Sequence, residues 1–289
     1  MQRKDKYGLQ DLKKQFPTEE ACLYYLFTTL HTKECSCGGS YKRIADRKQY
    51  QCSKCRFQIA PTSGTIFHKS DTPLSLWFHA IFVFSNAKSG VSAKELERQL
   101  GVTYKTAWRM LKLIREALGQ GKDKLDGDVE IDSAYFGGRG RSGKNNQNHS
   151  AVMSEKSVVI GAVKRGGNMK AIVTPDNSSR SHDAFLSMNV DKGARLLSDN
   201  TNVLKNVAMG YDRYMVNHSK QEYVRGNVHV NNIETFWAHT KRSIRGTHKV
   251  ISKKYLQSYL DGFVFHYNNR YSDRERFSAL FGALLSGSN

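Results

Sequence analysis

Four of the five cysteines stand in two close pairs, and this spacing limits what the N-terminal part of the chain can fold into more than any other feature. The pairs are Cys35 with Cys37 and Cys52 with Cys55. Two thiolate-bearing turns can meet at one tetrahedral Zn²⁺, and the metal then supplies stability that a short β-rich segment cannot obtain from an apolar core. The second pair has the usual two-residue gap, whereas the first has a gap of one. We therefore expect a zinc ribbon with a structural Zn²⁺, and the alternative is a degenerate ribbon that no longer holds metal.

The fifth cysteine and the N-terminal segment bear on where the protein works. Cys22 lies in an apolar helical run and is expected to be a buried thiol. Residues 1–16 are charged and lack the apolar core and cleavage site of a secretory signal. The longest apolar stretches, 22–27 and 76–84, fall well short of the roughly 18 residues that a membrane span needs. We expect a cytoplasmic protein with no membrane partner, with its thiols reduced or bound to metal.

The charge balance indicates a polyanionic partner. Lys and Arg number 45 and Asp and Glu 26, so the formal net charge is +19. A field this positive favours nucleic acid. The alternative is a basic surface that serves only to keep the protein soluble, and the motifs described below argue against it.

Residues 89–118 carry the signals of a helix-turn-helix. Ser92 can cap a first helix, Gly101 can end it, and Thr103 can cap a second. Such a motif places its second helix in the major groove of DNA. The residues that would then lie near DNA are Tyr104, Lys105, Thr106 and Arg109. The alternative is an ordinary pair of antiparallel helices packed within a core.

The polar, glycine-bearing segment 119–128 marks a boundary, after which the pattern changes. Strands are expected at 129–138, 157–167, 168–175 and 194–200, with helices near 182–188 and at 231–244. Three strands, a helix, a strand and a helix form the ribonuclease-H-like layout. We therefore expect an α/β fold with a ribonuclease-H-like catalytic domain. The expected domains are an N-terminal helical segment at 1–30, the zinc ribbon at 31–68, the helix-turn-helix region at 69–120 and the catalytic domain at 126–289.

Three acids stand on the first strand, the fourth strand and the last helix of that layout. Asp132 lies inside an otherwise apolar strand, where a carboxylate is costly unless it is paired or bound to metal. Asp199 ends a buried strand, although it could instead cap a following helix. Glu234 lies on the last helix, where Asn231, one turn earlier, competes as an oxygen ligand. Lys241 returns to nearly the same helix face about two turns later and could hold a phosphate.

Such a carboxylate cluster suits a pair of Mg²⁺ or Mn²⁺ ions, because hard cations need oxygen ligands. Two metal ions about 3.5–4 Å apart activate the attacking oxygen and stabilise the leaving oxygen of an in-line phosphoryl displacement. The sequence thus predicts metal-dependent phosphoryl transfer on nucleic acid, with Asp132, Asp199 and Glu234 as the metal-binding and catalytic residues.

Several blocks of the chain resemble bacterial insertion-sequence transposases of the DDE type with an N-terminal zinc ribbon, the ISXO-type group. The blocks are CSCGGSYKRIADRKQYQCSKCRFQIAPTSGTIF, SAKELERQLGVTYKTAWRML, EIDSAYFGG, LLSDN and HVNNIETFWAHTKRSIRGTHKVISKKYLQSYLDGFVFHYNNR. The resemblance covers nearly the whole chain. The chain departs from the group at Ser133 and Ala134, where Glu-Thr is more usual. It also departs at Gly262 and His266, which replace an acid and an arginine.

The resemblance implies a DNA transposase that binds the terminal inverted repeats of its own element, cleaves the ends and joins them to target DNA through a 3′-hydroxyl. It assigns metal binding to Asp132, Asp199 and Glu234, with Asn231 as a possible accessory residue. Lys241 and Arg242 would contact DNA. Joining two ends implies a homodimer or a higher oligomer on double-stranded DNA.

Two other functions remain open at this level. A transcriptional regulator, or a decayed transposase, would bind DNA through the ribbon and the helix-turn-helix without cleaving it. A ribonuclease-H-like nuclease or junction resolvase would cut without joining, and fold resemblance alone does not separate these functions.

Overall fold

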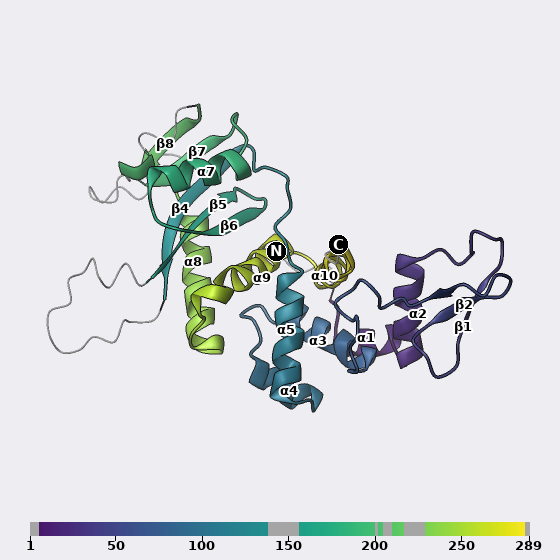
Figure 1. Cartoon of the computed structure of the whole chain (residues 1–289). Coiled ribbons are helices and arrows are strands. Elements are labelled where there is room, and N and C mark those ends of the chain that lie inside the picture. Colours follow the sequence, from purple (N-terminus) through teal and green to yellow (C-terminus); the bar gives the residue numbers. More distant parts are fainter. Residues whose placement is uncertain (1–5, 138–155, 200–201, 205–209, 217–228, 287–289) are drawn as a thin grey trace. The chain divides into compact units, whose positions relative to one another are not determined.

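The computed structural model describes residues 6–137, 156–199, 202–204, 210–216 and 229–286 (Figure 1). The chain divides into two compact units. The first comprises residues 1–87, 91–119 and 269–289, and the second comprises 88–90 and 120–268. Within the described residues, no helix combines the length and the apolar character needed to cross a membrane.

The first unit joins a small three-stranded sheet to a group of helices. Its antiparallel sheet has the order β1-β2-β3, with β1 at Tyr41–Arg43, β2 at Tyr50–Cys52 and β3 at Gln58–Ile59. Its helices are α1 (Leu9–Gln15), α2 (Glu19–Leu30), α3 (Leu74–Asn86), α4 (Ala93–Leu100), α5 (Tyr104–Glu116) and α10 (Asp273–Ser286).

Aromatic rings from distant parts of the sequence form the core of the first unit. The ring of Phe78 on α3 lies 4.7 Å from that of Phe16 and 4.7 Å from that of Phe281 on α10. Arg276 of α10 is 2% exposed and donates to the carbonyl of Ser85 at the end of α3. The sequence-based range 126–289 therefore differs from the packing at its C-terminal end, because α10 contributes its apolar side chains to the helical unit and not to the sheet of the second unit.

The helix caps expected between residues 89 and 118 are present. The Ser92 hydroxyl accepts from the N–H of Glu95, and the Thr103 hydroxyl accepts from the N–H of Thr106. Gly101 ends α4 with φ +66°, a left-handed conformation that glycine adopts without steric cost. Local sequence thus fixes where α4 and α5 begin and where α4 ends.

The second unit is built on one five-stranded mixed sheet with the order β6-β5-β4-β7-β8. β4 pairs antiparallel with β5 and parallel with β7, β5 pairs antiparallel with β6, and β7 pairs parallel with β8. The strands are β4 (Asp128–Phe136), β5 (Ser157–Lys164), β6 (Met169–Thr174), β7 (Arg195–Asp199) and β8 (Asp212–Val216). The helical elements are α7 (Ser179–Asn189), η1 (Asn202–Leu204), α8 (Asn231–Ser243), the π-helical η3 (Ile244–His248), η4 (Lys253–Tyr255) and α9 (Leu256–Asn268).

Alternation along β4 separates two apolar layers, one on each face of the sheet. Val129 and Ile131 pack in a cluster with α7. Ala134 and Phe136 pack in a second cluster with α8 and α9. Because side chains alternate along a strand, Asp132 belongs to the face that α8 covers.

The free edge of β6 is covered by side-chain amides of α9. Asn268 accepts from the N–H of Met169 at 2.8 Å and donates to its carbonyl at 3.1 Å. Gln257 accepts from the N–H of Val173 at 2.8 Å. These contacts satisfy backbone groups that an edge strand would otherwise expose, and they hold α9 beside the sheet.

Gly161 on β5 lets α8 approach the sheet closely. A Cβ at Gly161 would lie 2.7 Å from two ring carbons of Trp237 on α8. We expect Gly161→Ala to lower the free energy of unfolding by about 1–3 kcal/mol, because the buried indole must shift. Urea unfolding measures the effect. Gly193→Ala is the matched control, since a Cβ there meets nothing within 4 Å, and equal losses in the two variants would contradict the expectation.

Candidate active site and metal centre

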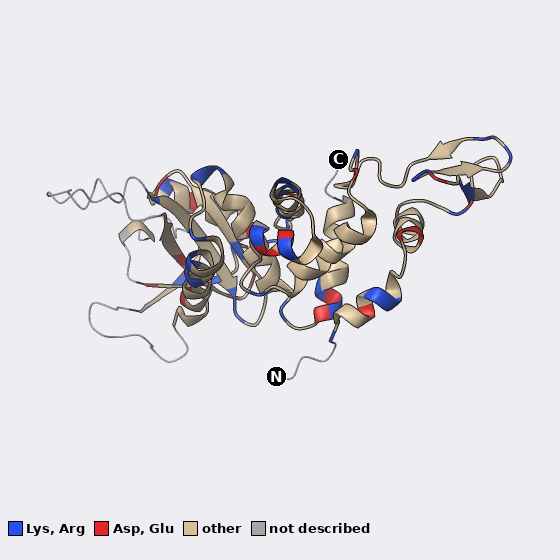
Figure 2. Ribbon diagram, turned by 90° about the horizontal axis from the view of Figure 1, so that it is seen from below, with Lys and Arg blue, Asp and Glu red and all other residues tan. Residues whose placement is uncertain are grey.

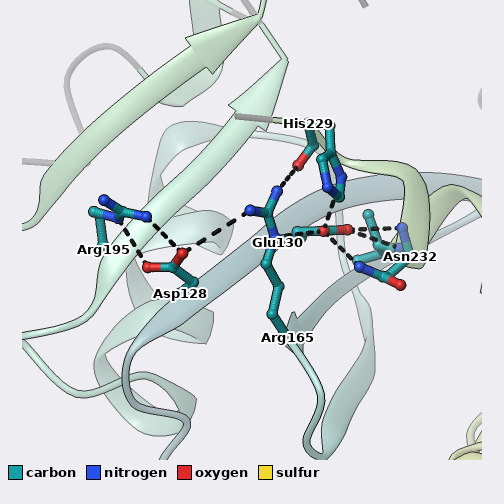
Figure 3. Close-up of polar contacts among 7 residues, drawn as sticks. Asp128, Glu130, Arg165, Arg195, His229 and Asn232 are labelled. Atoms are coloured by element: carbon teal, nitrogen blue, oxygen red, sulfur yellow. Dashed lines mark hydrogen bonds and ion pairs between the residues drawn. The ribbon is translucent and has the colours of Figure 1, made fainter. Parts of the chain in front are cut away.

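Three acids alternate along β4, and they differ in their counter-charges. Asp128 accepts two hydrogen bonds from Arg195, at 2.8 and 2.6 Å. Glu130 accepts from Nε of Arg165 at 3.0 Å (Figure 3). In the described part of the chain, no cationic nitrogen lies within ion-pair distance of the Asp132 carboxylate. With respect to the described residues, Asp132 is therefore the acid on this strand that remains available to an added cation.

The pairing of β4 with β7 ends at Glu130 and Leu197, and the same register continued by two residues brings Asp199 level with Asp132. β4 and β7 run parallel with Asp128 opposite Arg195, an offset of 67 residues, and 67 residues also separate Asp132 from Asp199. Leu196 packs on the α7 side of the sheet, so Asp199, three residues later, points to the α8 side. Two strands thus deliver carboxylates at equivalent positions on one face.

The third acid and the lysine arrive on α8. Asp132 pairs across the ladder with Gly161, and Trp237 of α8 packs on that glycine. Glu234 precedes Trp237 by three residues and Lys241 follows it by four, so all three share a helix face. Nζ of Lys241 lies 5.7 Å from the centre of the Phe136 ring, which is on the same face of β4 as Asp132.

The charges of Asp199, Glu234 and Lys241 all act on the Asp132 carboxyl group. Burial raises the pKa of Asp132 to about 6, and the nearby charges of Asp199 and Glu234 add to the increase while Lys241 opposes it. Burial also lowers the pKa of Lys241, and the charge of Asp132 opposes that change. The structure therefore brings together the three acids and the lysine that the sequence singled out.

These acids form a looser group than the cysteines do. Among the described residues, the four cysteines are the group whose ligand atoms all lie within 4.8 Å of one another, and the carboxylates of Asp132, Asp199 and Glu234 do not meet that spacing. Asn231, the first residue of α8, is exposed. The donor set of three carboxylates is the chemistry that hard divalent cations prefer.

Sequence reasoning missed the buried acid beside the site. Glu130 is 0% exposed and lies two residues before Asp132 on the same face of β4. Its carboxylate contacts Arg165, His229 and Asn232 (Figure 3). The alternation of Asp128, Glu130 and Asp132 was the available signal, because three acids at every second position of a strand share one face.

The four cysteines meet as the spacing predicted. Sγ of Cys35 lies 3.6 Å from that of Cys55, and Sγ of Cys37 lies 3.4 Å from that of Cys52. A disulfide would require about 2.05 Å. The sulfurs of a tetrahedral site with Zn–S near 2.3 Å stand roughly 3.8 Å apart. The cluster therefore fits a zinc ribbon, and the one-residue gap of the first pair does not keep the thiols apart.

Neighbouring groups support this cluster. The backbone N–H of Cys37 and the hydroxyl of Tyr41 lower the pKa of Cys35 to about 6, which favours the thiolate that metals bind. A Cβ at Gly39 would come within 2.6 Å of Sγ of Cys52. The ring of Tyr50 stacks at 4.1 Å on Phe27 of α2, so the small sheet is also fixed to a helix.

The expected DNA-contacting residues on α5 lie at its N-terminal end. Tyr104, Lys105 and Arg109 are exposed, and Thr106 is partly buried beside the Thr103 cap. A hollow of about 550 Å³ is lined by Tyr104, Lys105, Trp108, Arg109, Lys112 and Leu113. Arg242 is exposed on α8 next to Lys241. Basic residues occur on both units (Figure 2).

Residues 124–268 match the family described as the ISXO2-like transposase domain. The match covers half of the chain, and the chain therefore belongs to this family of transposase domains. The resemblance to insertion-sequence DDE transposases that the sequence blocks indicated is thereby confirmed.

One relative is described as an uncharacterised protein in the transposable element ISH50 of Halobacterium salinarum. It is 26% identical over 240 residues, which cover 78% of this chain and 79% of that protein. Among solved structures, the Mos1 strand transfer complex is similar at 10% identity and a TM-score of 0.30, covering 73% of this chain and 78% of that one. A pre-cleavage Mos1 transpososome gives 10% identity and a TM-score of 0.28, covering 73% and 76%.

Proposed function

We propose that this protein is a DNA transposase that cleaves the ends of an insertion sequence and joins them to target DNA. The observation that carries the proposal is the convergence of Asp132, Asp199 and Glu234 on one face of the sheet, with Asp132 lacking a cationic partner among the described residues. The order of the mixed sheet supports the ribonuclease-H-like layout. Membership of the transposase family supports the reaction class.

The three carboxylates would hold two Mg²⁺ or Mn²⁺ ions, which when bound activate the attacking oxygen and stabilise the leaving oxygen at phosphorus. Burial is the main cause of the raised pKa of Asp132, and the charges of Asp199 and Glu234 add to it, so a bound cation at this position would offset both effects. Lys241 would position a phosphate oxygen beside the acids. Glu234 remains the preferred third ligand over Asn231, because its charge contributes to the field at Asp132.

DNA recognition would come from the first unit. We assign the zinc ribbon a structural Zn²⁺ at Cys35, Cys37, Cys52 and Cys55, and the exposed start of α5 to the major groove of the inverted repeats. Tyr104, Lys105, Thr106 and Arg109 would contact bases and phosphates there, and Arg242 would contact phosphate. Affinity would then fall steeply with salt. Joining two ends implies a dimer or a higher oligomer on DNA.

A cleavage and strand-transfer assay on DNA that carries the element ends tests the proposal. We expect the wild type to cut and join in Mg²⁺ or Mn²⁺, and Asp132→Ala to lose at least about 10³-fold in rate, because the loss of metal-borne stabilisation is worth several kcal/mol. Asp128→Asn is the matched control, since Asp128 is paired with Arg195. Cleavage without joining would favour a nuclease, and specific binding without cleavage by the wild type would favour a regulator or a decayed transposase.

A further inference from the structure

A fully buried carboxylate joins β4 to the start of α8. Oε2 of Glu130 accepts from the backbone N–H of Asn232 at 2.8 Å and of Ile233 at 3.2 Å. Oε1 accepts from the side-chain amide of Asn232 at 2.7 Å. Figure 3 shows these contacts converging on one side chain from the strand.

This arrangement is a helix cap supplied from another element. The first N–H groups of a helix have no partner within the helix, and a local side chain usually accepts from them. Val230 occupies the cap position of α8 and supplies no side-chain hydrogen bond. Glu130 takes over that task, and its negative charge also suits the positive end of the helix.

The buried charge of Glu130 is compensated locally. Arg165 donates to Glu130 at 3.0 Å and to the carbonyl of His229 at 2.8 Å, so it also holds the residue that precedes the cap. Nδ1 of His229 lies 3.4 Å from Oε1 of Glu130, but its geometry is not that of a hydrogen bond. Because Arg165 balances its charge, Glu130 adds little net negative charge to the acids next to it.

The contacts hold α8 on both sides of the candidate site. Glu130 binds the helix at Asn232, two residues before Glu234. At the far end of β4, Phe136 lies beneath Lys241. α8 therefore runs along β4 in the same direction, and Asp132 and Glu234 both lie between these two contacts.

We propose that Glu130 is a positioning residue that fixes the first turn of α8 on β4 and thereby sets Glu234 beside Asp132 for metal binding. This inference rests on the proposed function, since it assigns Glu130 a role in the geometry of the same acidic site. Partners of metal ligands typically change metal affinity by about 10–100-fold when they are removed.

The test compares Glu130→Gln, Asn232→Ala, Asp128→Asn and Asp132→Asn with the wild type. Mn²⁺ binding to the full-length protein is measured by calorimetry, amide exchange of the first turn of α8 by mass spectrometry, and folding by urea midpoint. We expect Glu130→Gln to bind Mn²⁺ about 10–100-fold more weakly and to exchange faster at the start of α8. Asn232→Ala should also weaken Mn²⁺ binding and speed amide exchange at the start of α8, but by less, because it leaves the ion pair between Glu130 and Arg165 in place. Asp128→Asn removes the ion pair with Arg195 and a longer one, at 3.9 Å, with Arg165, but it leaves every contact of Glu130 with α8, and it should bind Mn²⁺ as the wild type does.

The outcomes distinguish a failure of the positioning role of Glu130 from a failure of the proposed function. If Glu130→Gln and Asn232→Ala are folded and bind Mn²⁺ like the wild type, the positioning role of Glu130 is wrong. If a urea midpoint falls equally in Glu130→Gln and Asp128→Asn while Mn²⁺ affinity does not change, the role of Glu130 is structural only. If the wild type binds no Mn²⁺, or Asp132→Asn binds as tightly as the wild type, the proposed function itself fails. Should Glu130→Gln not fold, Asn232→Ala decides the question by the same criteria.

Discussion

Removal of zinc is expected to unfold the ribbon at residues 31–68 while the sheet of the second unit remains folded. The three ribbon strands contain only 3, 3 and 2 residues. Such short strands bury too little apolar surface to fold without a staple, and the free energy of zinc binding is on the order of 10–16 kcal/mol in small zinc domains. The contacts of Tyr50 and Tyr41 with the ring of Phe27 on α2 are expected to be lost when the ribbon unfolds.

Zinc release and limited proteolysis measure this effect. The wild type should contain one zinc per chain, and chelation should make the Lys- and Arg-rich ribbon the first site of tryptic cleavage. Cys52→Ser should behave like the chelated wild type. Cys22→Ala is the matched control, because Cys22 is buried in α2 and lies outside the cluster. A metal-free ribbon that resists trypsin as well as the metal-bound one would contradict the assignment.

Asp132→Asn is expected to abolish cleavage and, at the same time, to stabilise the metal-free protein at pH 8. The folded-state pKa of Asp132 is about 6, compared with 3.8 for the ordinary group. A raised carboxyl pKa means that the folded state binds the proton more tightly than the unfolded state does. The ionised group therefore destabilises the fold fully above pH 6, and this penalty fades as the pH falls from 6 to below 4. An asparagine avoids it, with an expected gain of about 1–3 kcal/mol at pH 8.

Urea unfolding at pH 8 and pH 5, with and without Mg²⁺, checks this expectation. The advantage of Asp132→Asn should shrink at pH 5, and Mg²⁺ should stabilise the wild type but not the variant. Asp128→Asn should show the reverse sign at pH 8, because it breaks the two hydrogen bonds between Asp128 and Arg195. A wild type that is more stable than Asp132→Asn at pH 8 without metal would show that a compensating partner holds this carboxylate.

Local patterns predicted the elements of the site well. The alternation around Asp132 predicted β4, the apolar run before Asp199 predicted β7, and the helical spacing around Glu234 predicted α8. The caps at Ser92 and Thr103 were also confirmed. These features depend on hydrogen bonds and hydrophobic periods within a few residues of sequence, and such interactions can be seen in the sequence itself.

Long-range packing was harder to predict. Nothing near Val230 indicates that a carboxylate from β4 caps α8, because the partners Glu130 and Asn232 are 102 residues apart. The placement of α10 with the helical unit depends on Phe281 meeting Phe78, and its sequence is equally compatible with packing on a sheet.

By itself the sequence determined the element types and the grouping of four thiols, because these follow from residue type and short spacing, and it singled out three acids as candidate metal ligands from the elements that carry them. Only the tertiary structure decided that arginines neutralise Asp128 and Glu130, whereas no cation from the described residues does so at Asp132, since counter-ions come from other strands and loops. The tertiary structure also decided how α8 lies on β4. Glu130 binds the first turn of the helix, and Gly161 leaves room for Trp237 to pack on the sheet. Such contacts depend on register and close approach between distant segments, which no local pattern specifies.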